Sequence, residues 1–179
     1  MRQAPTLSGG NLVLRPPVPS DVDARLGLGR SPEILRGLGV DSADASPLTR
    51  SEVVAWLDKI ATSPTAWVVA FNGRFLGEIR LRDVDQTDRR ARLGIAFYDP
   101  TVLGQGLGRT AIRLLFPHAF QDLQLHRLSL RVLADNARAI ACYKACGFVE
   151  EGRERESALV GGGWVDDLIM GCLAHEAVY

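Results

Sequence analysis

The sequence predicts a mixed α/β fold around a central, mostly antiparallel sheet, and three observations predict it. Two apolar runs, 66–71 and 75–81, flank Asn72-Gly73, the strongest short signal for a hairpin of antiparallel strands. A strand-like run at 91–98, a glycine turn that opens an apolar helix, and an alternating run at 128–132 form a β-α-β unit. The two strands of such a unit run parallel.

Composition limits the class of protein. The chain has 179 residues, of which 46% are apolar and 23% charged, so we expect a single domain over residues 1–179 and exclude disordered or collagen-like chains. Lys+Arg and Asp+Glu both number 21, and a net charge of zero disfavours a nucleic-acid partner. No apolar run approaches the roughly 18 residues of a membrane span, so no membrane partner is expected.

The N-terminus and the cysteines indicate a cytoplasmic protein without a metal. The first 20 residues hold only one short apolar triplet, Leu12-Val13-Leu14, and lack the pattern of a signal peptide. The three cysteines, Cys142, Cys146 and Cys172, form no Cys-x-x-Cys pair and have no histidine at ligand spacing. We therefore expect them to be small core residues and expect no metal site.

The N-terminal half is expected to hold three strands and two helices. Residues 11–15 form a first strand that prolines end, and Ser20 or Asp21 caps a short helix towards residue 28. Residues 29–47 are rich in Gly, Pro, Ser and Asp, which predicts a long irregular connection or short helices. Thr49 or Ser51 opens a second helix as far as about Ile60, and the hairpin follows.

The C-terminal half adds four strands and two helices. Charged residues 83–90 make a turn before the strand at 91–98, and the helix from Leu107 to about Phe120 should kink at Pro117. After the strand at 128–132, Asp135 or Asn136 caps a helix that Gly147 ends. Strands at 148–160 and 164–173 complete a sheet of about seven strands flanked by about four helices.

The turn Leu103-Gly104-Gln105-Gly106-Leu107-Gly108 is a candidate anion site. Its glycines let an anion approach backbone N–H groups at the positive end of the following helix. The turn ends in Gly108-Arg109-Thr110, without the Gly-Lys-Ser/Thr of a P-loop, and its last glycine is misplaced for a dinucleotide site. Another pyrophosphate ligand or a merely tight turn are the two interpretations that stay open.

A second motif favours the ligand. The segment Asn136-Ala137-Arg138-Ala139-Ile140-Ala141-Cys142-Tyr143-Lys144-Ala145-Cys146-Gly147-Phe148 follows the strand at 128–132. Together with the glycine turn it resembles the GNAT superfamily of N-acetyltransferases, over about residues 93–173. The opening Leu12-Val13-Leu14-Arg15-Pro16 and the segment Gly163-Trp164-Val165-Asp166 resemble its RimJ/RimL branch.

The resemblance implies acetyl-coenzyme A as co-substrate. The parallel strands at 91–98 and 128–132 would be splayed for it, with backbone groups near Phe97 and Tyr98 pairing to the pantetheine arm. The other residues implied to bind it are Gly104, Gln105, Gly106, Leu107, Gly108 and Arg109 around the pyrophosphate, and Asn136 on the next helix. Leu103 stands where the family often has Arg or Gln, which removes a side-chain contact but keeps the backbone amides.

Two residues are candidates for proton transfer. Tyr143 lies seven residues after Asn136, on nearly the same helix face, and a phenol stays protonated at neutral pH and can donate to a departing thiolate. Its alternative role is an aromatic packed between helix and sheet. Glu78 is the candidate base, with an ion pair to Arg80 or Arg82 as its alternative fate. Asp166, Asp167 and a water chain compete for the role of base.

The predicted function is transfer of an acetyl group to a primary amine, a protein N-terminus or a small molecule, by direct attack in a ternary complex. The acceptor is expected where residues 29–47 and 161–167 overhang the cleft, and acids there would suit a cationic amine: Asp41, Asp44, Asp166 and Asp167. The alternatives are a non-catalytic acyl-CoA-binding or sensory module and a transferase that uses succinyl-CoA. A homodimer is compatible with the sequence.

Overall fold

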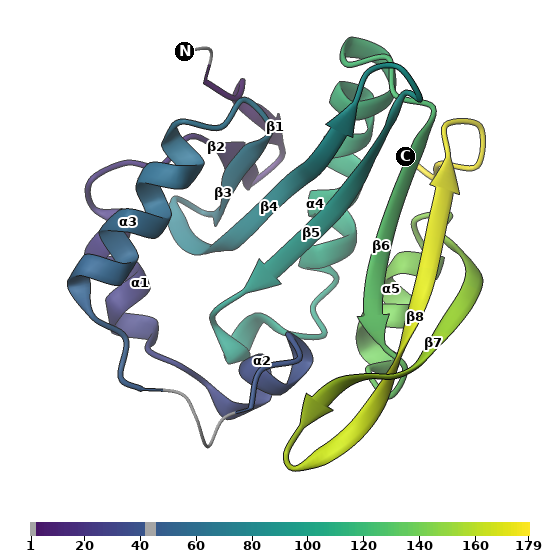
Figure 1. The fold of residues 1–179 in the computed structure, drawn as a ribbon. Coiled ribbons are helices and arrows are strands. Elements are labelled where there is room, and N and C mark those ends of the chain that lie inside the picture. The colour runs from purple at the N-terminus through teal and green to yellow at the C-terminus, as the bar shows by residue number, and fades with distance from the viewer. Residues whose placement is uncertain (1–2, 42–45) are drawn as a thin grey trace.

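The computed structural model describes residues 3–41 and 46–179. Its centre is one eight-stranded sheet in the order β1-β2-β3-β4-β5-β6-β8-β7 (Figure 1). The strands are β1 (Leu7–Gly9), β2 (Leu12–Arg15), β3 (Ala66–Phe71), β4 (Arg74–Asp85), β5 (Arg90–Phe97), β6 (Arg127–Leu133), β7 (Val149–Val160) and β8 (Gly163–Leu173). Only β5 and β6 pair in parallel; the other neighbours are antiparallel. The predicted mixed α/β fold is confirmed, with β1 as an additional edge strand.

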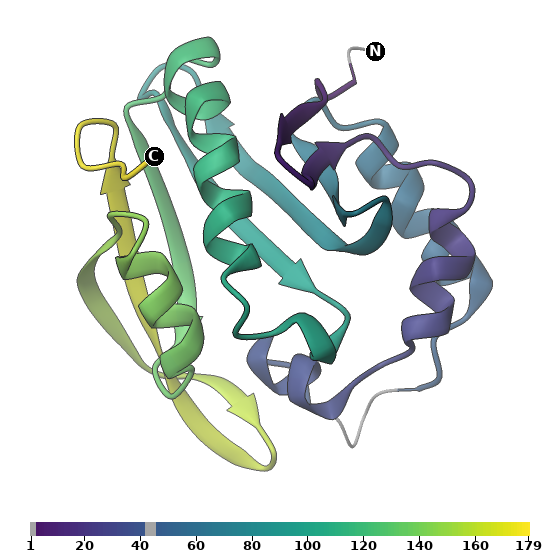
Figure 2. The same cartoon turned by 180° about the vertical axis from the view of Figure 1, so that it is seen from behind.

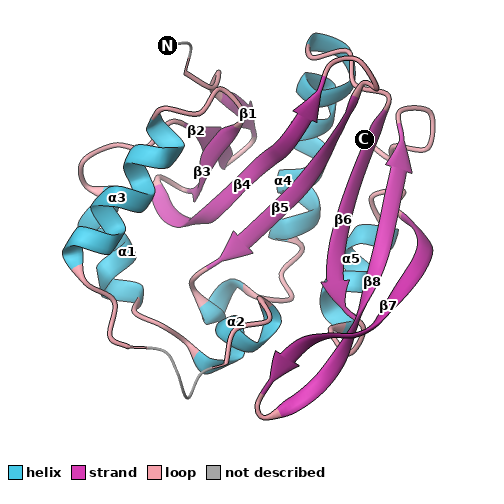
Figure 3. Ribbon diagram, in the orientation of Figure 1, coloured by secondary structure: helices cyan, strands magenta, loops and turns pink. Residues whose placement is uncertain are grey.

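Helices cover both faces of this sheet (Figure 3). They are α1 (Asp21–Leu28), α2 (Pro32–Gly37), α3 (Arg50–Ala61), α4 (Leu107–Pro117) and α5 (Ala137–Lys144). Figure 2 shows α4 and α5 lying along one face, while α1 and α3 lie beside the β2–β4 end. The helix α2 falls in the segment for which short helices were one of the two expectations. None of the described helices has the length and apolar content needed to cross a membrane.

Two apolar clusters hold these layers together. The larger one joins α4 to the sheet through fully buried side chains, among them Trp67, Ile79 and Phe116. The smaller one lies on the other face of β3 and β4, where Val53 and Leu57 of α3 pack with Val68 and Phe75, among others. Burial on both faces explains why β3 is apolar at five successive positions, 66–70, instead of alternating.

The helix α4 differs from expectation at its end. The sequence predicts a kink at Pro117; the regular helix instead ends there and a π-helical turn, His118–Asp122, follows. Proline has no N–H to donate to the preceding turn. The wider turn is closed by the N–H of Leu123, which donates to the carbonyl of His118 at 2.9 Å.

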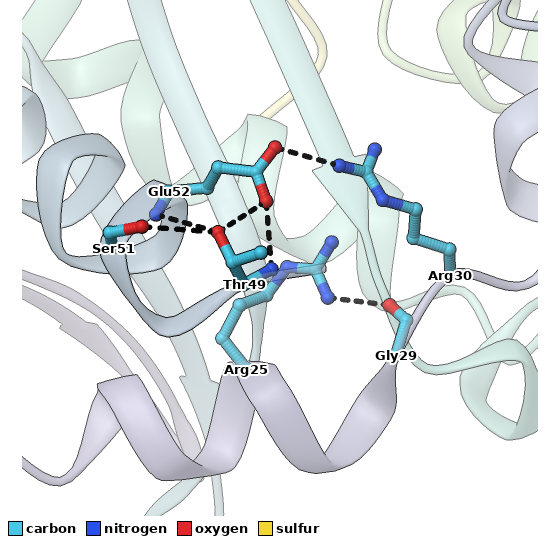
Figure 4. A network of polar contacts seen from close by, with 6 residues as sticks. All are labelled: Arg25, Gly29, Arg30, Thr49, Ser51 and Glu52. Carbon is cyan, nitrogen blue, oxygen red and sulfur yellow. Dashed lines mark hydrogen bonds and ion pairs between the residues drawn. The ribbon is translucent and has the colours of Figure 1, made fainter. Parts of the chain in front are cut away.

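Polar contacts hold the residues that follow α1 beside the start of α3 (Figure 4). Thr49 caps α3 by accepting from the Glu52 N–H, and the Glu52 carboxylate accepts from the Thr49 N–H at 2.7 Å, which completes a capping box. Arg30 contacts the same carboxylate at 3.4 Å, and Arg25 donates to the carbonyl of Gly29 at 2.6 Å. These bonds fix the start of the segment that leads to α2.

The strands β5 and β6 diverge, and this opening positions the functional site. Their pairing covers only Arg90, Ala91 and Arg92, opposite Arg127, Leu128 and Ser129. Beyond Arg92 the β6-facing edge of β5 has no strand partner as far as Phe97. Backbone N–H and C=O groups on such an edge are available to a ligand.

Candidate functional site

A cavity of about 550 Å³, here the first cavity, lies where β5 and β6 separate. The loop before α4, the start of α5 and one side of α2 enclose it. Its lining includes Gly37 and Leu38 beside α2, Ile95, Ala96 and Phe97 on β5, residues 102–109 of the loop and α4, and Asn136, Ala139, Cys142 and Tyr143 at α5. The sequence-predicted loop residues, Phe97, Asn136 and Tyr143 therefore meet around one space.

The glycine loop presents backbone donors to this cavity. Gly104 and Gly106 have φ of +78° and +79°, a left-handed conformation that favours glycine. Gly106 is the N-cap of α4, so the N–H groups of Leu107, Gly108 and Arg109, in the first turn, have no carbonyl partner within the helix. These donors lie at the positive end of the helix dipole, where they suit an anion.

Arg109 adds a positive charge at the same place. Its terminal nitrogen lies 3.5 Å from where a Cβ on Gly106 would stand, so the guanidinium folds back over the loop. Across the described ranges 3–41 and 46–179, Arg109 forms no ion pair with a carboxylate. Backbone donors together with an uncompensated cation fit a diphosphate group.

Tyr143 forms part of the wall between the two strands. Its ring packs edge-on against Phe148, with 5.9 Å between the centroids, and its hydroxyl has no hydrogen-bond partner among the described residues. Burial raises the pKa of Tyr143, and the neighbouring Cys142 and Cys146 raise it further. The phenol therefore stays protonated at neutral pH and has a free proton to donate.

Asn136 connects the site to α2. Its side-chain oxygen caps α5 by accepting from the Ala139 N–H at 3.2 Å, and its amide nitrogen donates to the Gly37 carbonyl at 3.4 Å. Two ion pairs join the same elements: Arg36 with Asp135 at 2.5 Å, and Arg138 with Glu33 at 2.7 Å. The sequence did not predict these links, because they join residues about 100 positions apart.

A second cavity, of about 680 Å³, lies on the other side of the β5–β6 opening. The two cavities share the residues Gly37, Leu38, Ile95, Ala96, Asn136, Ala139 and Tyr143. The charged side chains that line the second cavity are Glu78, Arg80, Arg82, Asp83, Arg92, Arg131 and Asp167. A group bound in one cavity can therefore meet a group bound in the other beside Tyr143.

Glu78 lines this second cavity and is held by three donors. Its carboxylate accepts from the Trp56 indole at 3.1 Å, from the Tyr98 hydroxyl at 3.2 Å and from Arg80. The side chain is only 12% exposed. The ion pair with Arg80 that the sequence offered as an alternative fate is present.

Tyr98 lies apart from the first cavity. Its N–H donates to the Leu76 carbonyl at 2.8 Å, and its ring lies under the Arg25 guanidinium, 4.0 Å from the centroid. Burial raises the pKa of its hydroxyl, which donates to Glu78. The structure therefore connects Tyr98 to the second cavity through Glu78.

The candidate acceptor-side acids are dispersed. Asp167 lines the second cavity, where it pairs with Arg131 at 2.8 Å, whereas Asp166 is bound by Arg153 and by the Glu156 N–H. Asp41 lines neither cavity, and Asp44 lies outside the described residues. Of the segment 29–47, Gly37, Leu38 and Gly39 line the second cavity, so the part of the chain around residue 38 lies beside the cleft.

Comparison with models of protein families identifies the family of this chain. The model of the acetyltransferase (GNAT) domain matches residues 11–149. The chain belongs to this GNAT acetyltransferase family. The resemblance inferred from the two motifs is confirmed at the level of the family.

Individual GNAT proteins are similar over part of the chain. A spermidine N(1)-acetyltransferase of Vibrio cholerae is 33% identical over 51% of this chain and 52% of its own length. An L-amino acid N-acetyltransferase of Escherichia coli is 31% identical over 64% of this chain and 73% of its own length. The chain thus spans about half the length of the first of these relatives.

Solved structures share the fold. The crystal structure of spermidine N-acetyltransferase from Vibrio cholerae in complex with CoA and spermine superposes with a TM-score of 0.78 and 24% identity. The superposition covers 94% of this chain and 98% of that one. At this identity the likeness supports the fold alone.

Proposed function

We propose that this chain transfers an acetyl group from acetyl-CoA to a primary amine by direct attack in a ternary complex. One observation carries the proposal: two cavities meet beside Tyr143, and the first of them contains a loop of free backbone donors. Separate spaces for donor and acceptor allow both substrates to be held in reacting orientation at once.

The first cavity fits the co-substrate at two points. The N–H groups of Leu107, Gly108 and Arg109 suit the diphosphate, with the Arg109 guanidinium beside them. The unpaired edge of β5, towards Phe97, offers backbone partners to the amide groups of a pantetheine arm. When bound, acetyl-CoA supplies an activated acetyl thioester; the chain holds and orients it and manages the protons.

Tyr143 serves as the acid in this proposal. As the new C–N bond forms and the C–S bond breaks, the departing sulfur takes the Tyr143 proton. The raised pKa and the free hydroxyl of Tyr143 keep that proton available at neutral pH. Because a thiolate is a tolerable leaving group, the contribution is partial, about 10-fold to 1000-fold.

Glu78 receives the proton that the attacking amine loses, directly or through water. Its Oε2 accepts from Trp56 and Arg80, whereas its Oε1 accepts only from Tyr98. Since each carboxylate oxygen has two acceptor sites, one site on Oε1 stays open to the amine or a water molecule. Replacing Glu78 with Gln should alter the pH–rate profile, and an unaltered profile would remove Glu78 from the mechanism.

The relatives leave the acceptor open, because one is named for spermidine and another for L-amino acids. We assign the chain to the RimJ/RimL-like branch because its opening, Leu12-Val13-Leu14-Arg15-Pro16, resembles the opening of that branch. The proposed reaction needs only an uncharged primary amine as the nucleophile, so a small amine and a protein N-terminus both remain candidate acceptors.

An acceptor panel with detection of free CoA thiol tests the proposal. We expect thiol release that depends on both acetyl-CoA and an amine, with mass spectrometry showing the acetylated amine. Binding of CoA without turnover on any amine would support the non-catalytic module instead. Faster turnover with succinyl-CoA than with acetyl-CoA would change the acyl donor but keep the reaction class.

A further inference from the structure

The second cavity contains more positive than negative side chains. Four arginines line it, Arg80, Arg82, Arg92 and Arg131, against three acids, Glu78, Asp83 and Asp167. Arg80 and Arg82 alternate with the core residues Ile79 and Leu81 on β4, so they share the sheet face of Glu78. The register places Arg92 of β5 directly opposite Arg82, on that same face.

Two of the four arginines are already neutralised. Arg80 pairs with Glu78, which is itself largely buried. Arg131 pairs with Asp167 at 2.8 Å and also with Glu154. Two of the three acids of the cavity, Glu78 and Asp167, are therefore neutralised by these two cations and leave little negative charge for a polycationic substrate.

Among the described residues, Arg82 and Arg92 have no close carboxylate partner to neutralise their charge. Arg82 has no ion pair and no hydrogen bond in the part of the chain that the structure describes. Arg92 approaches only Asp83, at 3.7 Å, and the two side chains are 65% and 71% exposed, so the pair contributes little. Like charges directly opposite each other on antiparallel strands are destabilising, which an anion between them would offset.

The Arg82 guanidinium lies over Gly94, close to the part of β5 that both cavities share. A Cβ at Gly94 would stand 3.4 Å from a terminal nitrogen of Arg82 and 3.5 Å from Cγ of Arg80, so both side chains lean over this glycine. Gly94 lies two residues before Ala96, where the two cavities meet. Two strand residues span about 7 Å.

From this geometry we infer that the acceptor amine carries an anionic group, a carboxylate or a phosphate, about 7 Å from its nitrogen, and that Arg82 and Arg92 bind that group. This inference rests on the proposed function and adds the substrate class to it. It also implies that polyamines are poor acceptors, because the unneutralised arginines repel a second ammonium group.

Four acceptors test the inference: 5-aminopentanoate and 3-aminopropyl phosphate, whose carboxyl carbon and phosphorus each lie five bonds from the amine nitrogen, together with pentylamine and 1,5-diaminopentane. We expect kcat/KM to be highest for one of the two anionic amines and lowest for the diamine. The ratio between the carboxylate and the phosphate identifies which anion the site prefers. Equal or higher kcat/KM for the diamine would overturn the inference.

Substitutions assign the effect to the two arginines. In Arg82→Gln and Arg92→Gln, kcat/KM for the preferred anionic amine should fall about 10-fold to 100-fold, since each removes a charged hydrogen bond. The value for pentylamine should stay within about 2-fold. Arg50→Gln is the matched control, because Arg50 is an exposed α3 residue that pairs with Asp23 and lines neither cavity. An equal loss for both amines would contradict the inference.

A binding measurement separates this inference from the proposed function. Calorimetry on the CoA-loaded protein should detect the preferred anionic amine with wild type and Arg50→Gln, and much weaker binding with Arg82→Gln. If no amine is acetylated, the proposed function fails, yet this binding difference still supports the anion site. Binding that does not depend on Arg82 or Arg92, or no binding of either anionic amine, overturns it.

Discussion

Replacing Gly106 with Ala tests the glycine loop. Gly106 has φ of +79° and caps α4, and an added Cβ would lie 3.5 Å from a terminal nitrogen of Arg109. We expect two separable effects: backbone strain, because an L-residue is disfavoured in this conformation, and weaker CoA binding, because the methyl group occupies the space between the loop donors and Arg109.

The two effects differ in size and in the property they change. The strain should lower the free energy of unfolding by about 1 to 2 kcal/mol. Loss of one hydrogen bond to a charged phosphate costs about 1.5 to 3 kcal/mol, so the Kd for CoA should rise about 10-fold to 150-fold.

Gly10→Ala provides the control for strain. Gly10 lies in the turn between β1 and β2 with φ of +58° and has no atom within 4 Å of an added Cβ. Urea unfolding should show similar destabilisation for both variants, whereas calorimetry with CoA should show a raised Kd only for Gly106→Ala. Wild-type affinity in Gly106→Ala would refute the assignment of the loop to the diphosphate.

Three further changes have defined outcomes. Tyr143→Phe should lower kcat about 10-fold to 1000-fold with little change in the Kd for CoA, and an unchanged kcat would remove Tyr143 from the mechanism. Because burial raises the pKa of Tyr143, ionisation of this residue should cause no decline in the wild-type rate below about pH 10. Phe116→Ala empties a fully buried position and should lower the free energy of unfolding by about 3 to 5 kcal/mol in urea; a loss below about 1 kcal/mol would contradict the core assignment. Thr49→Ala removes the capping box of α3 and should cost about 1 kcal/mol in the same assay, with CoA affinity unchanged.

Local signals in the sequence predicted most of the elements. Asn72-Gly73 indicated the β3–β4 hairpin, and Asn136 caps α5 as predicted, whereas the helix ends at Lys144 with Ala145 as its C-cap, before Gly147. The strand β1 was not predicted, because three residues ending in glycine give no periodicity and pairing with β2 decides their conformation. The strand β4 extends to Asp85 although Arg82, Asp83 and Asp85 are charged, because this end continues to pair with β5 and Val84 packs against the larger apolar cluster.

The candidate site also contains residues that local sequence predicts and residues that only the strand register brings together. The glycine loop and Tyr143 are contiguous motifs and could be found without a structure. The positive face of the second cavity could not, because opposition of Arg82 and Arg92 depends on the register of two strands. The link between Tyr98 and Glu78 depends equally on which side chains a strand turns to one face.

Amide hydrogen exchange with and without CoA tests the central claim most directly. If the first cavity holds the co-substrate, CoA should slow exchange at the N–H groups of residues 106–109 and at the N–H groups on the β6-facing edge of β5 between Leu93 and Phe97, where β6 does not pair. Unchanged exchange in both segments under saturating CoA, or protection confined to another part of the chain, would contradict the account.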